Sequence, residues 1–195
     1  MRRDFAARFP SLLHVTDSTA LPLIGRHGLL SAEALCALFA VPGAEALLAA
    51  NRDRYVTLRH PIHGEAALRR QKMPEAGLAA RLGPGLTPGC WRRFINAHVF
   101  FWVKERDARA LDGAEPGRAQ VTLRLRTAVL VAAGLQVLAS PVNGGSLDRA
   151  KPGTGRAREP GLYRPVHAVA PGEVVREVAV RGSITPDLLA AARLG

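Results

Sequence analysis

The sequence has few cysteines, no metal-binding pattern and no long hydrophobic run. Its two cysteines, Cys36 and Cys90, lie far apart in apolar surroundings, which is typical of buried thiols in a reducing cytoplasm. His60 and His63 lie three residues apart, but Pro61 prevents a regular helix there and no third ligand accompanies them, so we predict no metal site. No apolar run approaches the roughly 20 residues of a membrane span, and no signal peptide is recognisable. We therefore expect a cytoplasmic protein without membrane association.

Acidic residues are scarce beside basic ones. The 195 residues include 27 lysines and arginines but only 16 aspartates and glutamates, for a formal net charge of +11. Nearly all of these cations are arginines, and an arginine-rich surface attracts polyanions. Nucleic acid is therefore a candidate partner, although no nucleic-acid-binding motif is visible. Hydrophobic residues make up 48% of the chain, which at this length suffices for a single domain over residues 1–195.

The first stretch with recognisable chemistry lies near the N-terminus. Leu12–Thr16 is an apolar, β-branched run typical of a buried strand, and it places His14 and Thr16 on one face. A short helix follows and ends at Gly28. A helix start offers free N–H groups to a phosphate, and the two polar side chains can bond a carboxamide or a ribose. By itself, this spacing is more typical of a structural histidine–threonine pair than of a ligand site.

Further candidates come from the middle of the chain. Tyr55–Arg59 predicts a strand and Glu65–Gln71 a helix, so that Arg69 and Arg70 form the basic end of that helix. A solvated helix end explains such a pair, because cations are favourable at the negative end of the helix dipole. The alternative is that one guanidinium, more readily that of Arg69, reaches a pyrophosphate or a ribose.

Two later strand patterns carry an aromatic group and an acid. Val99–Val103 is aromatic and β-branched throughout, which is typical of a buried central strand, and alternation points Phe101 and Trp102 to opposite faces. Glu173–Val180 also alternates and places Glu177 in mid-strand between apolar neighbours. A carboxylate in that position needs a partner. Two interpretations of Glu177 stay open: it forms an ion pair with a neighbouring arginine, or it has a catalytic role.

The segment Ser140–Pro165 is the least regular part of the sequence. A stretch of this length without regular structure is usually functional or disordered. We interpret it as functional because it directly precedes the strand that carries Glu177. It holds five basic residues, Arg149, Lys151, Arg156, Arg158 and Arg164, against two acidic ones.

Taken in order, these motifs resemble DarT-type ADP-ribosyltransferases and an uncharacterised bacterial group of domains related to them. The resemblance extends over nearly the whole chain. It is carried by His14-x-Thr16 with a leucine-rich helix, by His27-Gly28-Leu29-Leu30-Ser31, by the arginine segment Leu68–Pro74, by the aromatic strand, and by Arg176–Val180 followed by Ile184–Asp187.

The resemblance implies an α/β (α+β) ADP-ribosyltransferase-like fold, with split, twisted β-sheets, flanking helices and NAD in the cleft between the sheets. It also implies transfer of ADP-ribose from NAD to a macromolecular acceptor, with a nucleic-acid base as the first expectation and the basic segment 140–165 presenting it. One or two of Phe100, Phe101 and Trp102 would stack on nicotinamide. The assigned residues are Glu177 and Arg69 as catalytic and His14, Thr16, Ser31, Arg70, Phe101 and Trp102 as NAD-binding.

The sequence also departs from this family. The middle strand lacks the family's proline and tyrosine, and the second half of the arginine segment has no counterpart. Two alternatives therefore stay open. One is a tRNA 2′-phosphotransferase-like enzyme of the same fold. The other is a non-catalytic, basic nucleic-acid-binding or toxin-associated module in which Glu177 is only ion-paired. A toxin role would bring an antitoxin partner.

Overall fold

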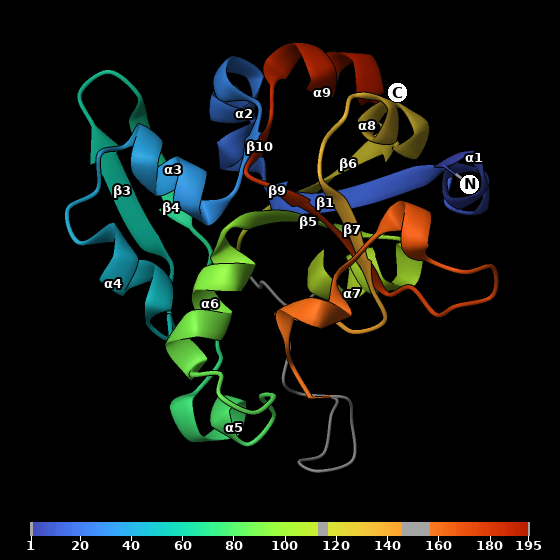
Figure 1. Cartoon of the computed structure of the whole chain (residues 1–195). Helices are drawn as coiled ribbons and strands as arrows, with labels where there is room; N and C mark the ends of the chain where they lie inside the picture. Colours follow the sequence, from blue (N-terminus) through green and yellow to red (C-terminus); the bar gives the residue numbers. More distant parts are fainter. Residues whose placement is uncertain (1, 113–116, 146–156, 195) are drawn as a thin grey trace.

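A computed structural model describes residues 2–112, 117–145 and 157–194. It shows a mixed α/β fold in which antiparallel sheets are flanked by helices (Figure 1). The main sheet has six strands, each antiparallel to its neighbours. In spatial order they are β6 (Gln120–Arg126), β1 (Ser11–Asp17), β5 (His98–Trp102), β9 (Glu177–Arg181), β7 (Val137–Ser140) and β8 (Arg164–Pro165).

Two small sheets and a set of short helices complete the described fold. β2 (Leu29–Leu30) pairs with β10 (Ser183–Ile184), and β3 (Val56–His60) pairs with β4 (Gly64–Leu68). The α-helices are α1 (Arg2–Arg8), α2 (Leu21–His27), α3 (Ala32–Leu38), α4 (Ala44–Ala49), α5 (Glu75–Ala79), α6 (Pro88–Asn96), α7 (Glu105–Asp112), α8 (Thr127–Ala132) and α9 (Pro186–Ala192). The 3-10 turns are η1 (Ser18–Ala20), η2 (Pro160–Leu162) and η3 (Val166–Ala168).

Each face of the main sheet packs against its own set of helices. On one face, Phe101 and Val178 belong to a buried cluster that includes residues of α1, α8 and α9. On the other face, Ala179 packs with Trp91 and Ile95 of α6. The β3–β4 hairpin and helices α3 and α4 share a separate buried cluster beside the sheet (Figure 1). The sheet is therefore covered on both sides, which accounts for the apolar character of its central strands.

Several local predictions are confirmed. The aromatic run forms β5, and Leu12–Thr16 lies within β1. Gly28 ends α2 with φ 78°, and its N–H bonds the Ile24 carbonyl oxygen. Ser31 caps α3, because its hydroxyl accepts a hydrogen bond from a backbone N–H in the first turn. Capping and strand patterns are short-range properties, so the sequence reveals them directly.

Two predictions about secondary structure were wrong. Residues 65–71 do not form a helix: 64–68 form β4, which pairs with β3 along its length. Burial of Leu68 beside Leu58 in the cluster with α3 and α4 outweighs the helical propensity of Glu-Ala-Ala-Leu. The strand expected over 173–180 begins only at Glu177, because a turn precedes it and Val174 is exposed. Glu177 therefore lies at a strand end.

We expect Gly28→Ala to destabilise the protein by about 2–4 kcal/mol. A Cβ at position 28 would lie 1.9 Å from the Ile184 carbonyl oxygen, and the positive φ disfavours any side chain. Gly25→Ala is the matched control, since Gly25 lies in the same helix with nothing within 4 Å of an added Cβ. Chemical denaturation should show the loss for Gly28→Ala alone. Equal stability of both variants would contradict the close approach of β10 to Gly28.

Candidate functional site

The three strands that carry the predicted motifs are neighbours in the main sheet. β1 bears His14 and Thr16, β5 bears the aromatic residues, and β9 begins with Glu177. The sheet order places β5 between the other two (Figure 1). Pairing of strands that are far apart in the sequence therefore brings residues from both ends of the chain into one region of the sheet.

The pairing between β1 and β5 is short. The two strands share a single opposed pair, Leu13 and Trp102, whereas β5 and β9 pair along five residues. Beside that pair, the His14 ring takes part in the connection: its Nδ1 lies 2.9 Å from the Phe100 carbonyl oxygen. A carbonyl oxygen only accepts, so Nδ1 donates, and Nε2 of a neutral ring is left as an acceptor. The imidazole thus lies where the β1–β5 ladder ends.

His14 is held in its neutral form. Burial lowers its pKa, and the positive charge of Arg69 acts in the same direction, while the bond to the Phe100 carbonyl opposes both. Arg69 directly follows β4, and its carbonyl oxygen accepts a hydrogen bond of 3.4 Å from Arg52 Nε. Of the predicted site residues, Arg69 therefore lies near enough to His14 for its charge to lower the pKa of the imidazole.

Glu177 lies in a separate, densely bonded environment. Its carboxyl is buried, and Oε1 accepts two hydrogen bonds, from the Gly144 backbone N–H at 2.7 Å and from the Tyr163 hydroxyl. The Gly144 carbonyl oxygen accepts a bond of 3.2 Å from Trp91 Nε1. A Cβ at position 144 would lie 2.2 Å from the Tyr163 hydroxyl oxygen, so glycine is required there. The carboxyl thus joins β9 to residues on both sides of segment 146–156.

The environment of Glu177 makes it a titratable group near neutral pH. Burial raises its pKa to about 7, while the hydrogen bonds from Tyr163 and Gly144 and the charge of Arg158 oppose that rise. Burial and the neighbouring Glu177 raise the pKa of Tyr163 well above its ordinary value, so the phenol keeps its hydrogen. A carboxyl that is about half ionised at pH 7 can accept or donate a proton, as general acid–base catalysis requires.

The register of the sheet separates the two groups of residues. Trp102 lies opposite both Leu13 and Glu177, and directly opposed side chains share a face. His14, next to Leu13, lies on the other face with Phe101, and the two rings are 5.6 Å apart. His14 and Glu177 therefore do not face each other across one surface of the sheet, although their strands lie within one sheet.

The remaining predicted residues differ in their surroundings. Ser31 is 1% exposed and its hydroxyl is engaged in capping α3, while Phe101 is 1% exposed within the main core. Neither offers a free surface to a ligand in this conformation. Thr16 on β1, Arg70 after β4 and Trp102 on β5 are each partly exposed. Of the aromatic strand, the partly exposed Phe100 and Trp102 share the Glu177 face, as alternation along a strand requires.

The contacts of Glu177 include residues that sequence reasoning missed. Tyr163, Gly144 and Trp91 form hydrogen bonds in this group, and Arg158 contributes its charge. The available signal was weak: a lone tyrosine and a glycine pair within an irregular, basic segment. Arg158 and Arg164 of that segment are described, whereas the predicted acceptor-contacting residues Arg149, Lys151 and Arg156 lie outside the described residues.

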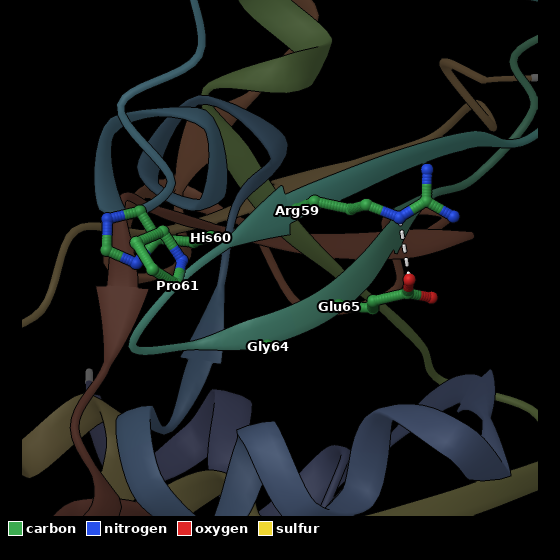
Figure 2. A pocket seen from close by; sticks show the side chains of 5 residues that line it. All are labelled: Arg59, His60, Pro61, Gly64 and Glu65. Atoms are coloured by element: carbon green, nitrogen blue, oxygen red, sulfur yellow. Dashed lines mark hydrogen bonds and ion pairs between the residues drawn. The ribbon is translucent and has the colours of Figure 1, made fainter.

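A surface hollow lies at the β3–β4 hairpin, away from these groups. Figure 2 shows its lining residues, with an ion pair of 2.7 Å between the exposed side chains of Arg59 and Glu65. His60 lines the hollow, and its ring stacks on that of His63 at 4.5 Å. None of the predicted site residues lines it, so the hollow gives no support to the assigned site.

Residues 2–112, 117–145 and 157–194 contain no group of three or more histidine, cysteine, aspartate or glutamate side chains arranged to hold a metal ion. The helices within these ranges are all too short or too polar to cross a membrane.

We expect Glu177→Gln to stabilise the folded protein above neutral pH. Because the pKa of Glu177 is raised to about 7 on folding, the folded protein keeps a proton that the unfolded chain has released between pH 4.5 and 7. The wild type therefore loses stability as pH rises through this range, on the order of 3 kcal/mol, and the neutral glutamine does not. Thermal unfolding of both proteins from pH 5 to 8 measures the difference. A gain that does not grow with pH would contradict a raised pKa.

Comparison with known proteins adds one finding. The search of curated proteins found no match, and neither did the search of solved structures. A protein-family model does match, over residues 10–190. These residues include β1, β5, β9 and the contacts of Glu177 described above. The chain therefore belongs to DUF7002, a family of unknown function.

Proposed function

We propose that this protein is an NAD-dependent ADP-ribosyltransferase. The observation that carries the proposal is the arrangement of β1, β5 and β9 as neighbouring strands, with a titratable carboxyl at the start of the third. It agrees with the motif order on which the sequence resemblance rests. The neutral His14 beside the cationic Arg69 adds an acceptor and a positive charge at the end of the β1–β5 ladder.

The groups around His14 fit the chemistry of a dinucleotide. Nε2 of the neutral imidazole accepts a hydrogen bond, which suits a ribose hydroxyl or a carboxamide N–H. The hydroxyl of Thr16, two residues further along β1, can donate or accept. The guanidinium of Arg69 suits a pyrophosphate, because its fork of N–H groups matches phosphate oxygens. In the proposed complex, these residues bind NAD, and Trp102, which shares the Glu177 face at the end of β5, lies against the nicotinamide.

The proposed reaction is a substitution at the ribose C1′. The bond between C1′ and the nicotinamide nitrogen breaks, and its electron pair leaves with nicotinamide. A lone pair of the acceptor forms the new bond to C1′, and the acceptor loses a proton. Ionised Glu177 stabilises the positive charge that develops on the ribose and takes up that proton. Its pKa of about 7 suits this role, because the carboxyl can bind and release a proton near neutral pH.

The acceptor in this proposal is a nucleic-acid base. The formal net charge of +11 favours a polyanionic partner, and Arg158 and Arg164 lie close in sequence to the Tyr163 that bonds Glu177. The antitoxin partner that a toxin role would bring stays a prediction. DNA, RNA and protein acceptors are separate outcomes of the same experiment.

A second candidate function rests on the burial of Glu177. Its side chain is 3% exposed, and both hydrogen bonds to Oε1 come from within the chain. A carboxyl in this state can serve as a structural tie in a non-catalytic, basic nucleic-acid-binding module. The two candidates differ in one measurable property, the consumption of NAD.

We expect wild-type protein to release nicotinamide from NAD in the presence of cell extract and to label a macromolecule from radioactive NAD. Glu177→Gln should lower turnover by about 1000-fold while changing the Kd for NAD less than threefold. His14→Asn keeps an amide donor for the Phe100 carbonyl but removes the Nε2 acceptor, so it should weaken NAD binding by about tenfold. Nuclease and protease digestion of the labelled product then identify the acceptor class.

The same assay decides between the candidates. Nucleic-acid binding without NAD binding or labelling would establish the non-catalytic module and overturn the enzyme. Turnover that survives Glu177→Gln would remove Glu177 from the reaction. If protease rather than nuclease removes the label, the protein is still an ADP-ribosyltransferase, but its acceptor is a protein and not a nucleic-acid base.

We expect the turnover rate to rise with pH through about 7. Only ionised Glu177 can stabilise positive charge and accept a proton, and burial raises its pKa to about 7, so turnover falls as pH drops below that value. Rates of nicotinamide release from pH 5.5 to 9 at saturating NAD measure this limb. A rate that is constant from pH 5.5 to 7.5 would contradict Glu177 as the group that must ionise.

A further inference from the structure

Tyr163 occupies an unusual place among the residues of the Glu177 group. It follows η2, and its ring packs with the rings of Trp91, Phe94, Phe100 and His98. Its hydroxyl donates to Glu177 Oε1. The ring is thus fixed by aromatic packing on several sides, and its one polar atom is directed at the carboxyl.

A second residue, Ser140, acts on the Tyr163 hydroxyl. Ser140 lies at the end of β7, directly opposite Glu177, and is completely buried. Its oxygen accepts from the Val142 N–H at 3.2 Å, and its hydroxyl lowers the pKa of the Tyr163 phenol. Each hydroxyl has one hydrogen to donate. An ionised carboxylate only accepts, so the Tyr163 hydroxyl donates its hydrogen to Glu177.

We propose that Tyr163 is a positioning residue for Glu177: its hydroxyl, together with the Gly144 N–H, fixes Oε1 and so orients the carboxylate toward the ribose of NAD. This inference rests on the proposed function. Both hydrogen bonds end on the same oxygen, so they hold one edge of the carboxylate against the protein. A group held at one edge presents a defined direction to a substrate, as catalysis by a fixed acid or base requires.

The charged groups around Tyr163 and Glu177 favour an ionised carboxylate. Arg158 lowers the pKa of both Glu177 and Tyr163, and Arg81 lies near Arg158. His98 stacks on the Tyr163 ring, and burial lowers the pKa of that histidine, so it adds no positive charge at pH 7. The donor hydroxyl of Tyr163, the Gly144 N–H and the charge of Arg158 therefore favour ionisation of Glu177 against burial.

Two tyrosines provide a matched pair of variants. Tyr163→Phe removes the hydroxyl but keeps the packed ring, and Tyr55→Phe removes the other tyrosine hydroxyl while keeping a ring beneath Arg118. Ser140→Ala removes a hydroxyl that lowers the pKa of Tyr163 and leaves Tyr163 itself intact, so it tests the same inference if Tyr163→Phe unfolds. Each variant is compared with wild type by thermal unfolding, by titration of ¹³C-labelled glutamate carboxyls, and by the pH profile of NAD turnover. Glu177→Gln identifies the Glu177 resonance.

We expect Tyr163→Phe to move the Glu177 titration upward by about one pH unit, because a donor to the ionised form is lost. The acid limb of kcat should move with it, and kcat should stay several-fold below wild type at pH 9, where the carboxyl is ionised but no longer held. The KM for NAD should change less than twofold. Ser140→Ala should give a smaller shift of the same sign, and Tyr55→Phe should give none.

The measurements separate this inference from the proposed function. If wild-type protein turns over no NAD, the proposed enzyme is lost, and with it the orienting role toward NAD, while the carboxyl titration still decides whether Tyr163 holds Glu177. An unchanged Glu177 titration in both Tyr163→Phe and Ser140→Ala would overturn the role of the Tyr163 hydroxyl in holding Glu177. A shifted titration with wild-type kcat at pH 9 would show that Tyr163 sets ionisation alone and would overturn positioning.

Discussion

The burial of one carboxyl group constrains this structure more than any other single feature. Glu177 opens a central strand with its side chain almost fully removed from water, and an unpaired charge in such a place is costly. The protein meets this cost with donors from residues 144 and 163, which flank segment 146–156 in the sequence. The carboxyl therefore ties residues 144 and 163 to the middle of the main sheet.

Helix α6 supports both groups of predicted site residues. Trp91 donates to the Gly144 carbonyl and so reaches the Glu177 group. Five residues further on, Asn96 accepts a bond of 2.9 Å from the buried Arg52, whose Nε donates to the Arg69 carbonyl. One helix thus fixes the position of Glu177 on one side and of the backbone at Arg69 on the other. A ligand that contacts both groups would therefore bind residues whose relative positions are fixed by α6.

Sequence reasoning succeeded where the cause was local and failed where it was distant. The Ser31 cap and the aromatic strand β5 follow from short-range patterns. The helix expected at residues 65–71 failed because pairing with β3 and burial of Leu68 lie outside any local window. The sequence predicts that Glu177 needs a partner, because an acidic residue between apolar neighbours in a strand pattern is recognisable. It does not predict that Tyr163 is the donor, because no local pattern around Tyr163 indicates which side chain is buried.

The register of the sheet sets a specific condition on the proposed chemistry. His14 and Glu177 belong to strands separated only by β5, yet their side chains leave the sheet on opposite faces. A dinucleotide that contacts both must pass the end of β5, where the β1–β5 ladder is reduced to the pair of Leu13 and Trp102. Trp102 is therefore the residue that such a ligand would have to displace or stack against. Its partial exposure at a strand end makes it the least constrained ring of β5 to do so.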